Sequence, residues 1–201
     1  MPENSYEVVR LKGTEIASVS DELAALRITV FRDYPYLYDG SLAYEKEYLQ
    51  IYSRAERAFI AAIYYKGTLV GATTCIPLAD ETDELKKPFL ESGFDPDRFF
   101  YFGESIILHE HRGKGLGHLF FDEREAHARS FGTFTYTCFC SVDRGTSHPL
   151  RPADYRSNDA FWLKRGYQPM SSLQAEMEWP DIGETSSTFK PMVFWIKELK
   201  E

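Results

Sequence analysis

Hydrophobic residues recur along this chain with two different periods, and the period separates the predicted helices from the predicted strands. Between residues 16 and 30 the apolar positions step by three and four, which predicts an amphipathic helix. Residues 59–65 and 68–78 are apolar runs on either side of Lys66-Gly67, which predicts a hairpin with a glycine at its turn. The predicted strands cover 6–11, 59–65, 68–78, 101–108, 133–142, 167–179 and 192–199, and the predicted helices cover 16–30, 42–54, 116–130 and 157–165.

Three segments have no clear period. Residues 31–40 form a compact turn rich in tyrosine, and residues 79–98 are polar, contain two prolines and leave room for one short helix. Residues 143–156 form a long irregular segment, also with two prolines. Because long loops are uncommon inside a compact domain unless they have a function, we expect this last segment to contribute to a site.

Length and composition indicate one ordered domain that spans residues 1–201. A chain of 201 residues is large enough for a two-layer core, and 43% of its residues are apolar and 15% are aromatic. No internal repeat, low-complexity segment or linker divides the sequence. We therefore expect a single globular unit rather than a disordered chain.

Charge and cysteine content restrict the partners and the compartment. The formal net charge of −8 argues against a nucleic acid partner, because binding to phosphates requires a basic face. An acidic surface suits a cationic acceptor such as an amine, although solubility alone explains it equally well. No stretch approaches the ~20 apolar residues of a membrane span, residues 1–4 are unlike a signal peptide, and three cysteines do not form an even disulfide set. We expect a cytoplasmic protein with no membrane partner.

A glycine-rich run, Arg112-Gly113-Lys114-Gly115-Leu116-Gly117, lies between the predicted strand over 101–108 and the predicted helix over 116–130. Alternate glycines allow a tight turn and leave the backbone amides uncovered. The free N–H groups of the first helical turn, the helix dipole and the side chains of Arg112 and Lys114 favour an anion. The run therefore predicts a phosphate-binding loop, and the alternative is a plain turn between a strand and a helix.

The spacing of the glycines excludes two common phosphate-binding motifs. A dinucleotide fingerprint that starts at Gly113 requires a glycine at the position of His118, and a P-loop requires Ser or Thr where Gly115 stands. What remains is Arg-x-x-Gly-x-Gly, with Ile107 five residues before the arginine. This pattern, placed between a strand and a helix, resembles the signature of the GNAT superfamily of acyl-CoA-dependent N-acyltransferases. The order of the predicted elements resembles that superfamily over nearly the whole chain.

The resemblance implies an α/β (α+β) fold, in which a single GNAT-like domain has a mixed central sheet of about seven strands flanked by about four helices. In that fold a bulge splays the central strands, and Gly103 is the candidate bulge position. The resemblance also implies acetyl-CoA as the co-substrate, with its pyrophosphate on the loop amides and its pantetheine arm along the preceding strand. The cofactor-binding residues implied in this way are Ile106, Ile107, Leu108, Arg112, Gly113, Lys114, Gly115, Leu116, Gly117 and His118.

Acyl transfer to an amine requires a base, because an amine with a pKa of about 10.4 is protonated at neutral pH and cannot attack. Glu104 is the first candidate, since it is a carboxylate inside an apolar strand, where perturbed catalytic carboxylates are found. The alternatives are a structural acid paired with an arginine or a tyrosine, and a side chain that faces solvent.

The acid of the reaction is harder to assign. The resemblance places the usual acid, a tyrosine, at the position of Trp162, and an indole gives no useful proton to a thiolate. Tyr155 is the best substitute and His148 the next, with unassisted departure of the thiolate as the third alternative. Trp162 either packs against the pantetheine arm or fills the core, and the sequence favours neither.

Tyr34, Tyr36 and Tyr38 lie in the aromatic turn, where the resemblance implies the substrate-binding pocket for the acceptor. The alternative is a turn fixed to the core by its tyrosines. A His-x-His pair at 109–111 and a Cys-x-Cys pair at 138–140 lack the usual zinc spacing, and buried cysteines are the better interpretation. We expect no metal.

These observations predict an N-acetyltransferase that transfers an acetyl group from acetyl-CoA to a primary amine of a small molecule or a peptide. One alternative is a catalytically inactive acyl-CoA-binding sensor on the same fold, which Trp162 makes reasonable. Another is an enzyme of the same fold that uses longer acyl chains. Residues 192–196 are apolar on both faces of a predicted strand, which favours association into a homodimer.

Overall fold

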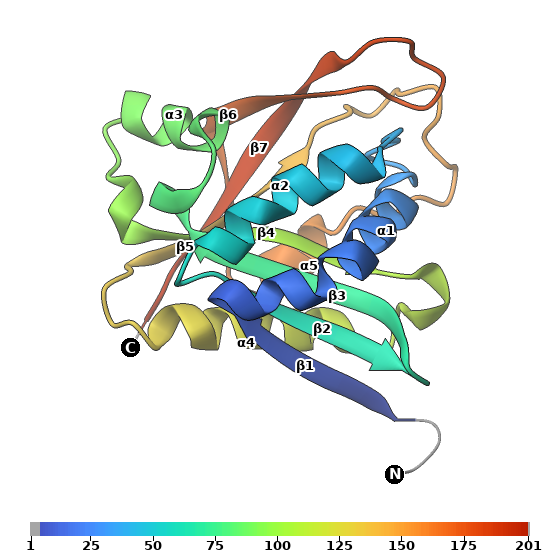
Figure 1. Cartoon of the computed structure of the whole chain (residues 1–201). Coiled ribbons are helices and arrows are strands. Elements are labelled where there is room, and N and C mark those ends of the chain that lie inside the picture. Colours follow the sequence, from blue (N-terminus) through green and yellow to red (C-terminus); the bar gives the residue numbers. More distant parts are fainter. Residues whose placement is uncertain (1–4, 201) are drawn as a thin grey trace.

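The computed structural model describes residues 5–200, which contain a seven-stranded sheet with the order β1-β2-β3-β4-β5-β7-β6 (Figure 1). The strands are β1 (Tyr6–Lys12), β2 (Phe59–Tyr65), β3 (Thr68–Pro77), β4 (Phe99–Ile107), β5 (Tyr136–Val142), β6 (Gln168–Trp179) and β7 (Thr188–Glu198). Neighbouring strands are antiparallel except β4 and β5, which are parallel, so the sheet is mixed as predicted. The prediction that residues 1–4 are not a signal peptide lies outside the described residues.

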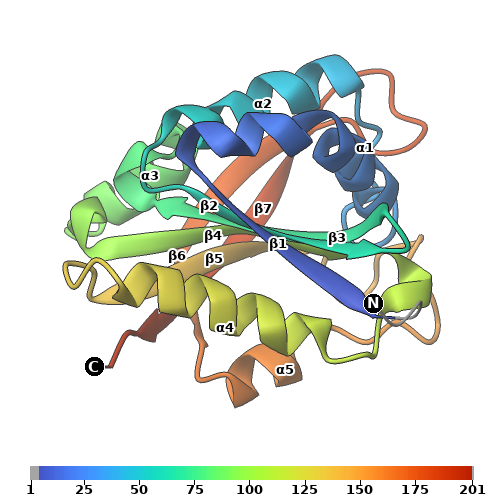
Figure 2. The ribbon, with the colours of Figure 1, turned by 60° about the horizontal axis from the view of Figure 1, so that its bottom comes forward.

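Helices cover both faces of the sheet. The α-helices are α1 (Ser20–Phe31), α2 (Leu42–Arg54), α3 (Asp83–Glu91), α4 (Leu116–Arg129) and α5 (Asp159–Lys164), and short 3-10 helices occupy Gly13–Val19, Leu78–Asp80, Pro96–Arg98 and His109–His111. Figure 2 shows α1, α2 and α3 on one face and α4 and α5 on the other. From residue 5 to residue 200, no helix is both long enough and apolar enough to cross a membrane.

The first helix begins later than its apolar pattern predicts. Residues Gly13–Val19 form a 3-10 helix, and α1 begins at Ser20. Ile16 and Val19 are both buried and lie three residues apart. That spacing suits the three-residue turn of a 3-10 helix as well as one turn of an α-helix, so the apolar pattern alone does not separate the two.

The polar stretch between β3 and β4 does contain one short helix. In α3, Leu85 and Phe89 are buried and lie four residues apart, on one face of the helix. The Phe89 ring contacts the rings of Phe99 and Phe194, at centroid distances of 4.9 Å and 4.8 Å. Two apolar residues are therefore sufficient to fix this helix on the sheet.

The side chains of β4 alternate between the two faces until a bulge interrupts them. Phe99 and Tyr101 pack on the α1–α3 face, and Phe100 and Phe102 pack on the α4 face. Regular alternation would turn Glu104 toward α4. The pairing with β3 shifts at this point, because Thr73 opposes Ser105 whereas Cys75 opposes Phe102, so β4 holds one extra residue.

The bulge brings two successive residues of β4 to the same face. A Cβ atom on Gly103 would lie 2.0 Å from the Tyr52 hydroxyl oxygen, and Tyr52 belongs to α2. The next side chain, Glu104, binds Arg27 of α1 on this same face. The predicted bulge at Gly103 is thus confirmed, and it directs Glu104 between the helices and the sheet.

Strands β4 and β5 separate after a short paired segment. Their pairing runs only from Phe99 to Tyr101 on β4 and from Tyr136 to Cys138 on β5. Beyond it, β4 continues beside β3 and β5 continues beside β7. The predicted splaying of the central strands is confirmed, and it opens the middle of the sheet.

The apolar run over 192–196 is buried within the chain. Met192 and Phe194 pack on the α1–α3 face, and Trp195 packs on the opposite face. Side chains of β7 on both faces of the sheet therefore belong to the core. This burial explains the apolar pattern inside one chain, and the homodimer stays a prediction.

We expect Gly103→Ala to lower the free energy of unfolding by about 1–3 kcal/mol, because the new methyl group overlaps the hydroxyl groups of Tyr52 and Thr74. Denaturant unfolding measures the change. Removing the Tyr52 hydroxyl in the double variant Gly103→Ala, Tyr52→Phe should recover part of the loss. The control is Gly117→Ala, whose methyl group would meet only the Phe161 ring at 3.5 Å. Equal stability of Gly103→Ala and the wild type would contradict the packing of α2 on the bulge.

Candidate functional site

The glycine-rich run connects β4 to α4 and exposes its backbone. Gly113 and Gly115 have φ angles of 73° and 82°, in the left-handed region that other residues adopt only with strain. A Cβ atom at either position would meet no other described residue within 4 Å, so the space beside the loop is open. Gly115 is the N-cap of α4, and the amides of a first helical turn have no acceptor within the helix. The loop therefore presents hydrogen-bond donors to open space, as an anion site requires.

Arg112 fastens this loop to the rest of the protein. Its Nε donates to the Ile107 carbonyl oxygen at 3.0 Å, and its Nη2 lies 3.3 Å from a carboxylate oxygen of Asp33. The side chain of Lys114 is exposed and, in contrast to that of Arg112, is not held by an ion pair among the described residues, and its ammonium group lies 5.9 Å from the centroid of the Tyr6 ring. Backbone donors and Lys114 thus remain available at the loop, whereas Arg112 is engaged.

The residues on either side of the loop differ in exposure. Ile106 is buried, and Ile107 and Leu108 at the end of β4 are half-buried. On the helix, Leu116 is buried and anchors the first turn. His118 is exposed, and its ring lies 4.9 Å from the Phe161 ring.

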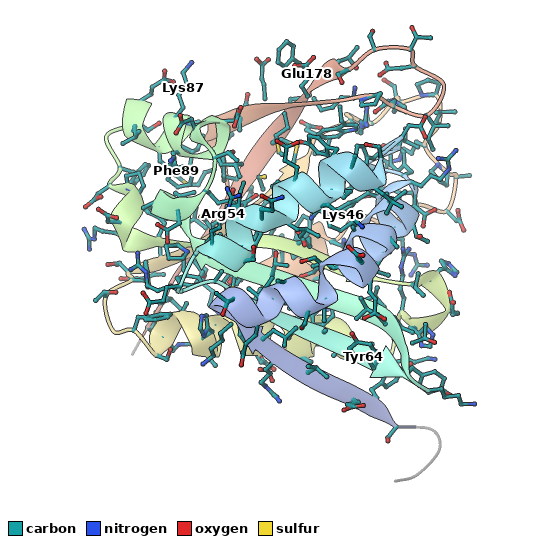
Figure 3. All side chains as sticks on the ribbon, in the orientation of Figure 1. Lys46, Arg54, Tyr64, Lys87, Phe89 and Glu178 are labelled. Carbon is teal, nitrogen blue, oxygen red and sulfur yellow. The ribbon has the colours of Figure 1, made fainter. Side chains whose placement is uncertain are left out.

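A cavity of about 100 Å³ lies on the α1–α2 face of the sheet, where β4 and β5 separate. Aromatic and sulfur-containing side chains form most of its wall, together with three carboxylates and one guanidinium group. The described lining residues are Arg27, Phe31, Tyr36, Tyr38, Tyr44, Glu45, Tyr48, Tyr101, Gly103, Glu104, Cys140, Met177, Glu178, Trp179 and Met192. Glu178, which is exposed, lies on the β6–β7 hairpin (Figure 3).

Two carboxylates in the cavity wall share one guanidinium group. Arg27 donates from Nε to Oε2 of Glu45 and from Nη1 to Oε2 of Glu104. Glu45 is fully buried and Glu104 is 5% exposed. In each carboxylate the other oxygen, Oε1, is buried and has no hydrogen-bond partner among residues 5–200. With two negative groups and one positive group, this cluster carries a net negative charge and two free acceptors.

Arg27 remains charged although it is buried. Burial lowers the pKa of its guanidinium group, but the charges of Glu104 and Glu45 outweigh that effect and raise the pKa well above its usual value. Its guanidinium carbon also lies 5.1 Å from the Phe31 ring centroid and 4.6 Å from the Tyr48 ring centroid. The aromatic wall therefore already holds one cation against its faces.

The aromatic turn contributes two of its three predicted tyrosines to the cavity. Tyr36 and Tyr38 line it, and burial raises the pKa of both phenols, so both stay protonated. The carboxylate of Glu45 raises the pKa of Tyr38 further. Tyr34 does not line the cavity; its ring contacts the Tyr155 ring at 4.6 Å.

The structure brings Tyr155 and His148 together around Tyr34, outside the cavity wall. The His148 ring lies 5.8 Å from the Tyr34 ring. Burial, and then the charges of Tyr34 and Asp159, raise the pKa of Tyr155, so its phenol is protonated at neutral pH. Nδ1 of His148 accepts a hydrogen bond from the Leu150 amide at 3.2 Å, which leaves Nε2 to hold the proton of the neutral ring.

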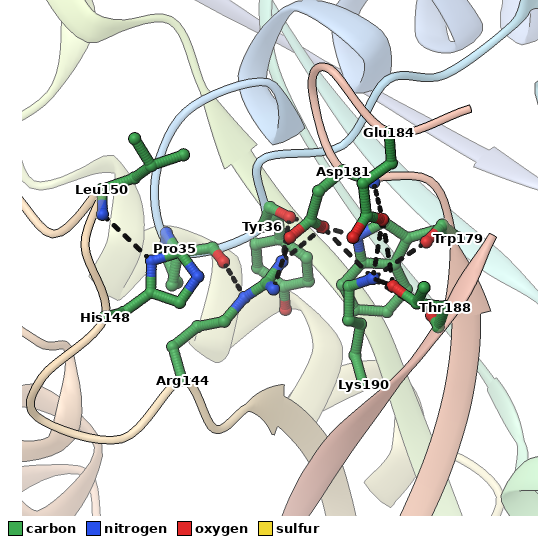
Figure 4. Close-up of polar contacts among 10 residues, drawn as sticks. All are labelled: Pro35, Tyr36, Arg144, His148, Leu150, Trp179, Asp181, Glu184, Thr188 and Lys190. Carbon is green, nitrogen blue, oxygen red and sulfur yellow. Dashed lines mark hydrogen bonds and ion pairs between the residues drawn. The ribbon is translucent and has the colours of Figure 1, made fainter. Parts of the chain in front are cut away.

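Arg144 joins the irregular segment over 143–156 to two other loops (Figure 4). Its Nε donates to the Pro35 carbonyl oxygen at 2.7 Å and its Nη2 to the Tyr36 carbonyl oxygen at 2.5 Å. Two further hydrogen bonds, of 2.7 Å and 2.8 Å, reach the carboxylate of Asp181. Arg144 thus connects this segment to the aromatic turn, and the contribution of the segment to a site stays a prediction.

Asp181 is the second member of this clamp. Burial opposes its ionisation, but the hydrogen bonds and charge of Arg144, together with the charge of Lys190, lower the pKa of Asp181 below its usual range. Lys190 is buried, and it donates to the carbonyl oxygens of Trp179 and Thr188 at 3.0 Å and 3.1 Å. The β6–β7 loop is therefore held in place next to the end of β6, where Met177, Glu178 and Trp179 line the cavity.

Trp162 packs into the core on the far face of the sheet. Its ring contacts the rings of Phe139 and Trp195, each at a centroid distance of 5.0 Å. The residue is half-buried. These contacts agree with the core-filling alternative, and its contact with a cofactor stays a prediction.

Sequence reasoning did not identify Arg27, Glu45 or Arg144. A signal for the first two was present, because Arg27 lies four residues after Leu23 and Glu45 four residues before Leu49, so both charges stand in apolar stripes of helices. Buried charges are rare unless they are paired, which makes such positions informative. For Arg144 the only signal in the sequence was the unusual length of the irregular segment over 143–156.

The sulfur and histidine side chains do not assemble a metal centre in the part of the chain that the structure describes. No group of three or more His, Cys, Asp or Glu side chains there is arranged to hold a metal ion. The three cysteines are buried and free. Burial raises the pKa of Cys140, in the cavity wall, to about 12, so its thiol stays protonated.

Solved structures with the same architecture come from several bacteria. An N-acetyltransferase from Staphylococcus aureus is 11% identical, with a TM-score of 0.61 and coverage of 98% of this chain and 99% of that chain. A ribosomal-protein-alanine N-acetyltransferase from Brucella melitensis is 14% identical, with a TM-score of 0.61 and coverage of 95% and 99%. The yncA protein of Salmonella typhimurium, solved with its cofactor acetyl-CoA, is 11% identical, with a TM-score of 0.53 and coverage of 97% and 95%. At these identities the likeness shows a shared fold.

The sequence supplies the link to a family. No curated protein matches it at a significant level. The sequence profile of the "Acetyltransferase (GNAT) family" matches residues 23–150, which is more than half of the chain. The chain therefore belongs to the acetyltransferase (GNAT) family.

Proposed function

We propose that the protein is an N-acetyltransferase that transfers an acetyl group from acetyl-CoA to a primary amine. One observation carries the proposal: Glu104, whose buried Oε1 has no donor among the described residues, lines a cavity at the point where β4 and β5 separate. The glycine-rich loop at the end of the same strand supplies an anion site. A base and a binding site for the coenzyme thus lie on one strand and its continuation.

The loop fits the pyrophosphate of coenzyme A. The amides from Gly113 to Gly117 would donate to its oxygens, since the left-handed glycines leave the space beside the backbone open. The His118 amide already donates to the Gly115 carbonyl oxygen at 3.0 Å. Lys114 would add a positive charge. The half-buried Ile107 and Leu108 continue from this loop along β4 and would contact the pantetheine arm. Bound acetyl-CoA supplies the activated acetyl group.

The acceptor must lose a proton before it can react. Its ammonium group would give one proton to Oε1 of Glu104, and the neutral nitrogen would then attack the thioester carbon. A C–N bond forms, the C–S bond breaks, and the electron pair leaves on sulfur. The nitrogen loses a second proton to become an amide, and the sulfur gains one to become a thiol, so the net reaction releases one proton.

Tyr155 is the proposed donor of the proton to sulfur, with His148 as the alternative. Tyr155 is protonated at neutral pH because burial raises the pKa of its phenol. It lies against Tyr34, in the aromatic turn that also supplies Tyr36 to the cavity wall. Neither Tyr155 nor His148 lines the cavity, so either would act from its edge.

One observation favours a second function, an acyl-CoA-binding sensor without catalysis. Trp162 stands where the superfamily has its acid, and its ring packs in the core. A sensor would keep the loop and the cavity and would not turn over.

The decisive experiment incubates the protein with acetyl-CoA and a panel of primary amines and follows the release of free thiol. An N-acetyltransferase releases one thiol for each amine that it acetylates. Mass spectrometry detects the acetylation as a mass increase of the amine. Binding of acetyl-CoA without thiol release on any amine would favour the sensor.

The loop assignment predicts that Gly115→Val loses coenzyme A binding, because the branched side chain would occupy the open space that the pyrophosphate requires. Calorimetry with coenzyme A measures the loss. Gly132→Val is a matched control, since Gly132 also has a positive φ, 66°, and open space around it, but lies beyond the other end of α4. Both variants carry the same type of backbone strain, and only Gly115→Val should lose binding. Normal binding by a folded Gly115→Val would refute the assignment.

The base assignment predicts that Glu104→Gln lowers the rate by about 10²–10⁴ and leaves coenzyme A affinity nearly unchanged. Raising the pH should partly restore the rate, because more of the amine arrives without its proton. Glu81→Gln is the control for loss of a buried carboxylate, since Glu81 already accepts from Tyr52 and from the Thr82 amide. Wild-type turnover by Glu104→Gln across the pH range would assign the base elsewhere.

A further inference from the structure

The wall of the cavity contains more negative charge than a single reacting amine can balance. Its described residues include Glu45, Glu104 and Glu178 against one cation, Arg27, which gives three negative charges and one positive charge. Arg27 already binds Glu45 through Nε and Glu104 through Nη1. If Glu104 serves the reacting nitrogen, one negative charge of the wall is still without a cation, and the two other carboxylates are the buried Glu45 and the exposed Glu178.

Glu45 is the more informative of these two. It is fully buried, lines the cavity, and has Oε2 bound to Arg27 and Oε1 bound to nothing among the described residues. A buried charged acceptor without a donor is unfavourable, and an ammonium group would supply a charge-assisted hydrogen bond. Glu45 and Glu104 bind the same guanidinium group, so two ammonium groups joined by a short chain can reach both.

The remaining wall suits the hydrocarbon chain between two such groups. Met177 and Met192 are flexible apolar side chains that adapt to methylene groups. Tyr38 and Tyr48 present rings beside Glu45 and Arg27, and the Arg27 guanidinium already lies 4.6 Å from the Tyr48 centroid. Aromatic faces attract alkylammonium groups in the same way.

An acceptor that carries a carboxylate group would be repelled by this wall. Its carboxylate would face three carboxylates, and the one guanidinium in the wall has its Nε and Nη1 donors already bound. The acceptors excluded by this arrangement are free amino acids and amines that end in an acid.

We propose, on the basis of the acetyltransferase function proposed above, that the acceptor is an aliphatic diamine or polyamine. Glu104 faces the reacting nitrogen, and Glu45 binds a second ammonium group of the same molecule. The competing arrangement is internal: the Tyr38 hydroxyl lies near Glu45 and could turn to satisfy Oε1, which would make Glu45 structural.

The test compares three amines with the same four-carbon chain and different ends: 1,4-diaminobutane, butylamine and 4-aminobutanoate. Initial rates of thiol release give kcat/KM for each with the wild-type protein. We expect 1,4-diaminobutane to exceed butylamine by about tenfold or more, equivalent to about 1.4 kcal/mol of binding, and 4-aminobutanoate to be the poorest. Equal kcat/KM values for the three, or a preference for 4-aminobutanoate, would overturn the proposal.

Glu45→Gln identifies the residue responsible. We expect it to reduce the advantage of 1,4-diaminobutane over butylamine to near unity, mainly through KM, and to leave coenzyme A affinity close to wild type. Glu81→Gln, a buried carboxylate outside the cavity wall, should preserve the advantage. If Glu45→Gln keeps the full preference for 1,4-diaminobutane, Glu45 does not bind the acceptor. If this variant does not fold, the three-amine comparison on the wild type still decides the substrate class.

Calorimetry separates this inference from the catalytic proposal. Titration of 1,4-diaminobutane into the complex of the protein with coenzyme A needs no turnover. Binding to the wild type that is lost in Glu45→Gln, without thiol release on any amine, would support the diamine site and refute the acetyltransferase. Thiol release with butylamine but no binding of 1,4-diaminobutane would support the acetyltransferase and refute the diamine site.

Discussion

The parallel strands β4 and β5 share hydrogen bonds over only three residues of each strand, from Phe99 to Tyr101 and from Tyr136 to Cys138. Backbone N–H and C=O groups away from water need partners, so a sheet that opens in its interior creates two unsatisfied edges. An extended molecule with amide groups can use such edges as another strand would. The separation therefore leaves two strand edges inside the fold, of which the one on β4 continues to the glycine-rich loop.

The same region depends on a single extra residue in β4. The bulge at Gly103 turns Glu104 from the α4 face to the face that α1 and α2 cover. There it meets Arg27, and Glu45 completes the group. A buried ion pair contributes little net stability, but removal of one partner leaves a charge uncompensated and costs about 3–5 kcal/mol. The cluster thus ties two helices to the sheet at the cavity, and one buried oxygen of each carboxylate has no hydrogen-bond partner among the described residues.

Much of this architecture could be predicted from the sequence, for reasons that are local. The seven strands follow apolar runs, and the glycine-rich loop follows from residue spacing, because glycine conformations and strand patterns depend on neighbours along the chain. The cavity wall could be predicted only in part. Tyr36 and Tyr38 line it as expected, whereas Tyr34 lies outside with Tyr155.

The cluster of Arg27, Glu45 and Glu104 escaped prediction because it joins three elements that are distant in sequence. The Arg27 contacts span 18 and 77 residues. A helical pattern shows that Arg27 and Glu45 stand at core positions, but not which charges they meet. Similarly, the 3-10 start of the first helix uses the same apolar spacing as an α-helix, so only tertiary packing decides between them.

The Arg144 clamp has a consequence for the order in which the site forms during synthesis. Its hydrogen bonds to Pro35 and Tyr36 span 109 and 108 residues, and those to Asp181 span another 37. Chains are made from the N-terminus, and contacts across long segments form after local ones. While the ribosome is still adding the middle of the protein, the aromatic turn has neither Arg144 nor the β6–β7 loop to hold it. The nascent chain can build its first helices and hairpin early, but the cavity closes only when nearly the whole polypeptide has been released.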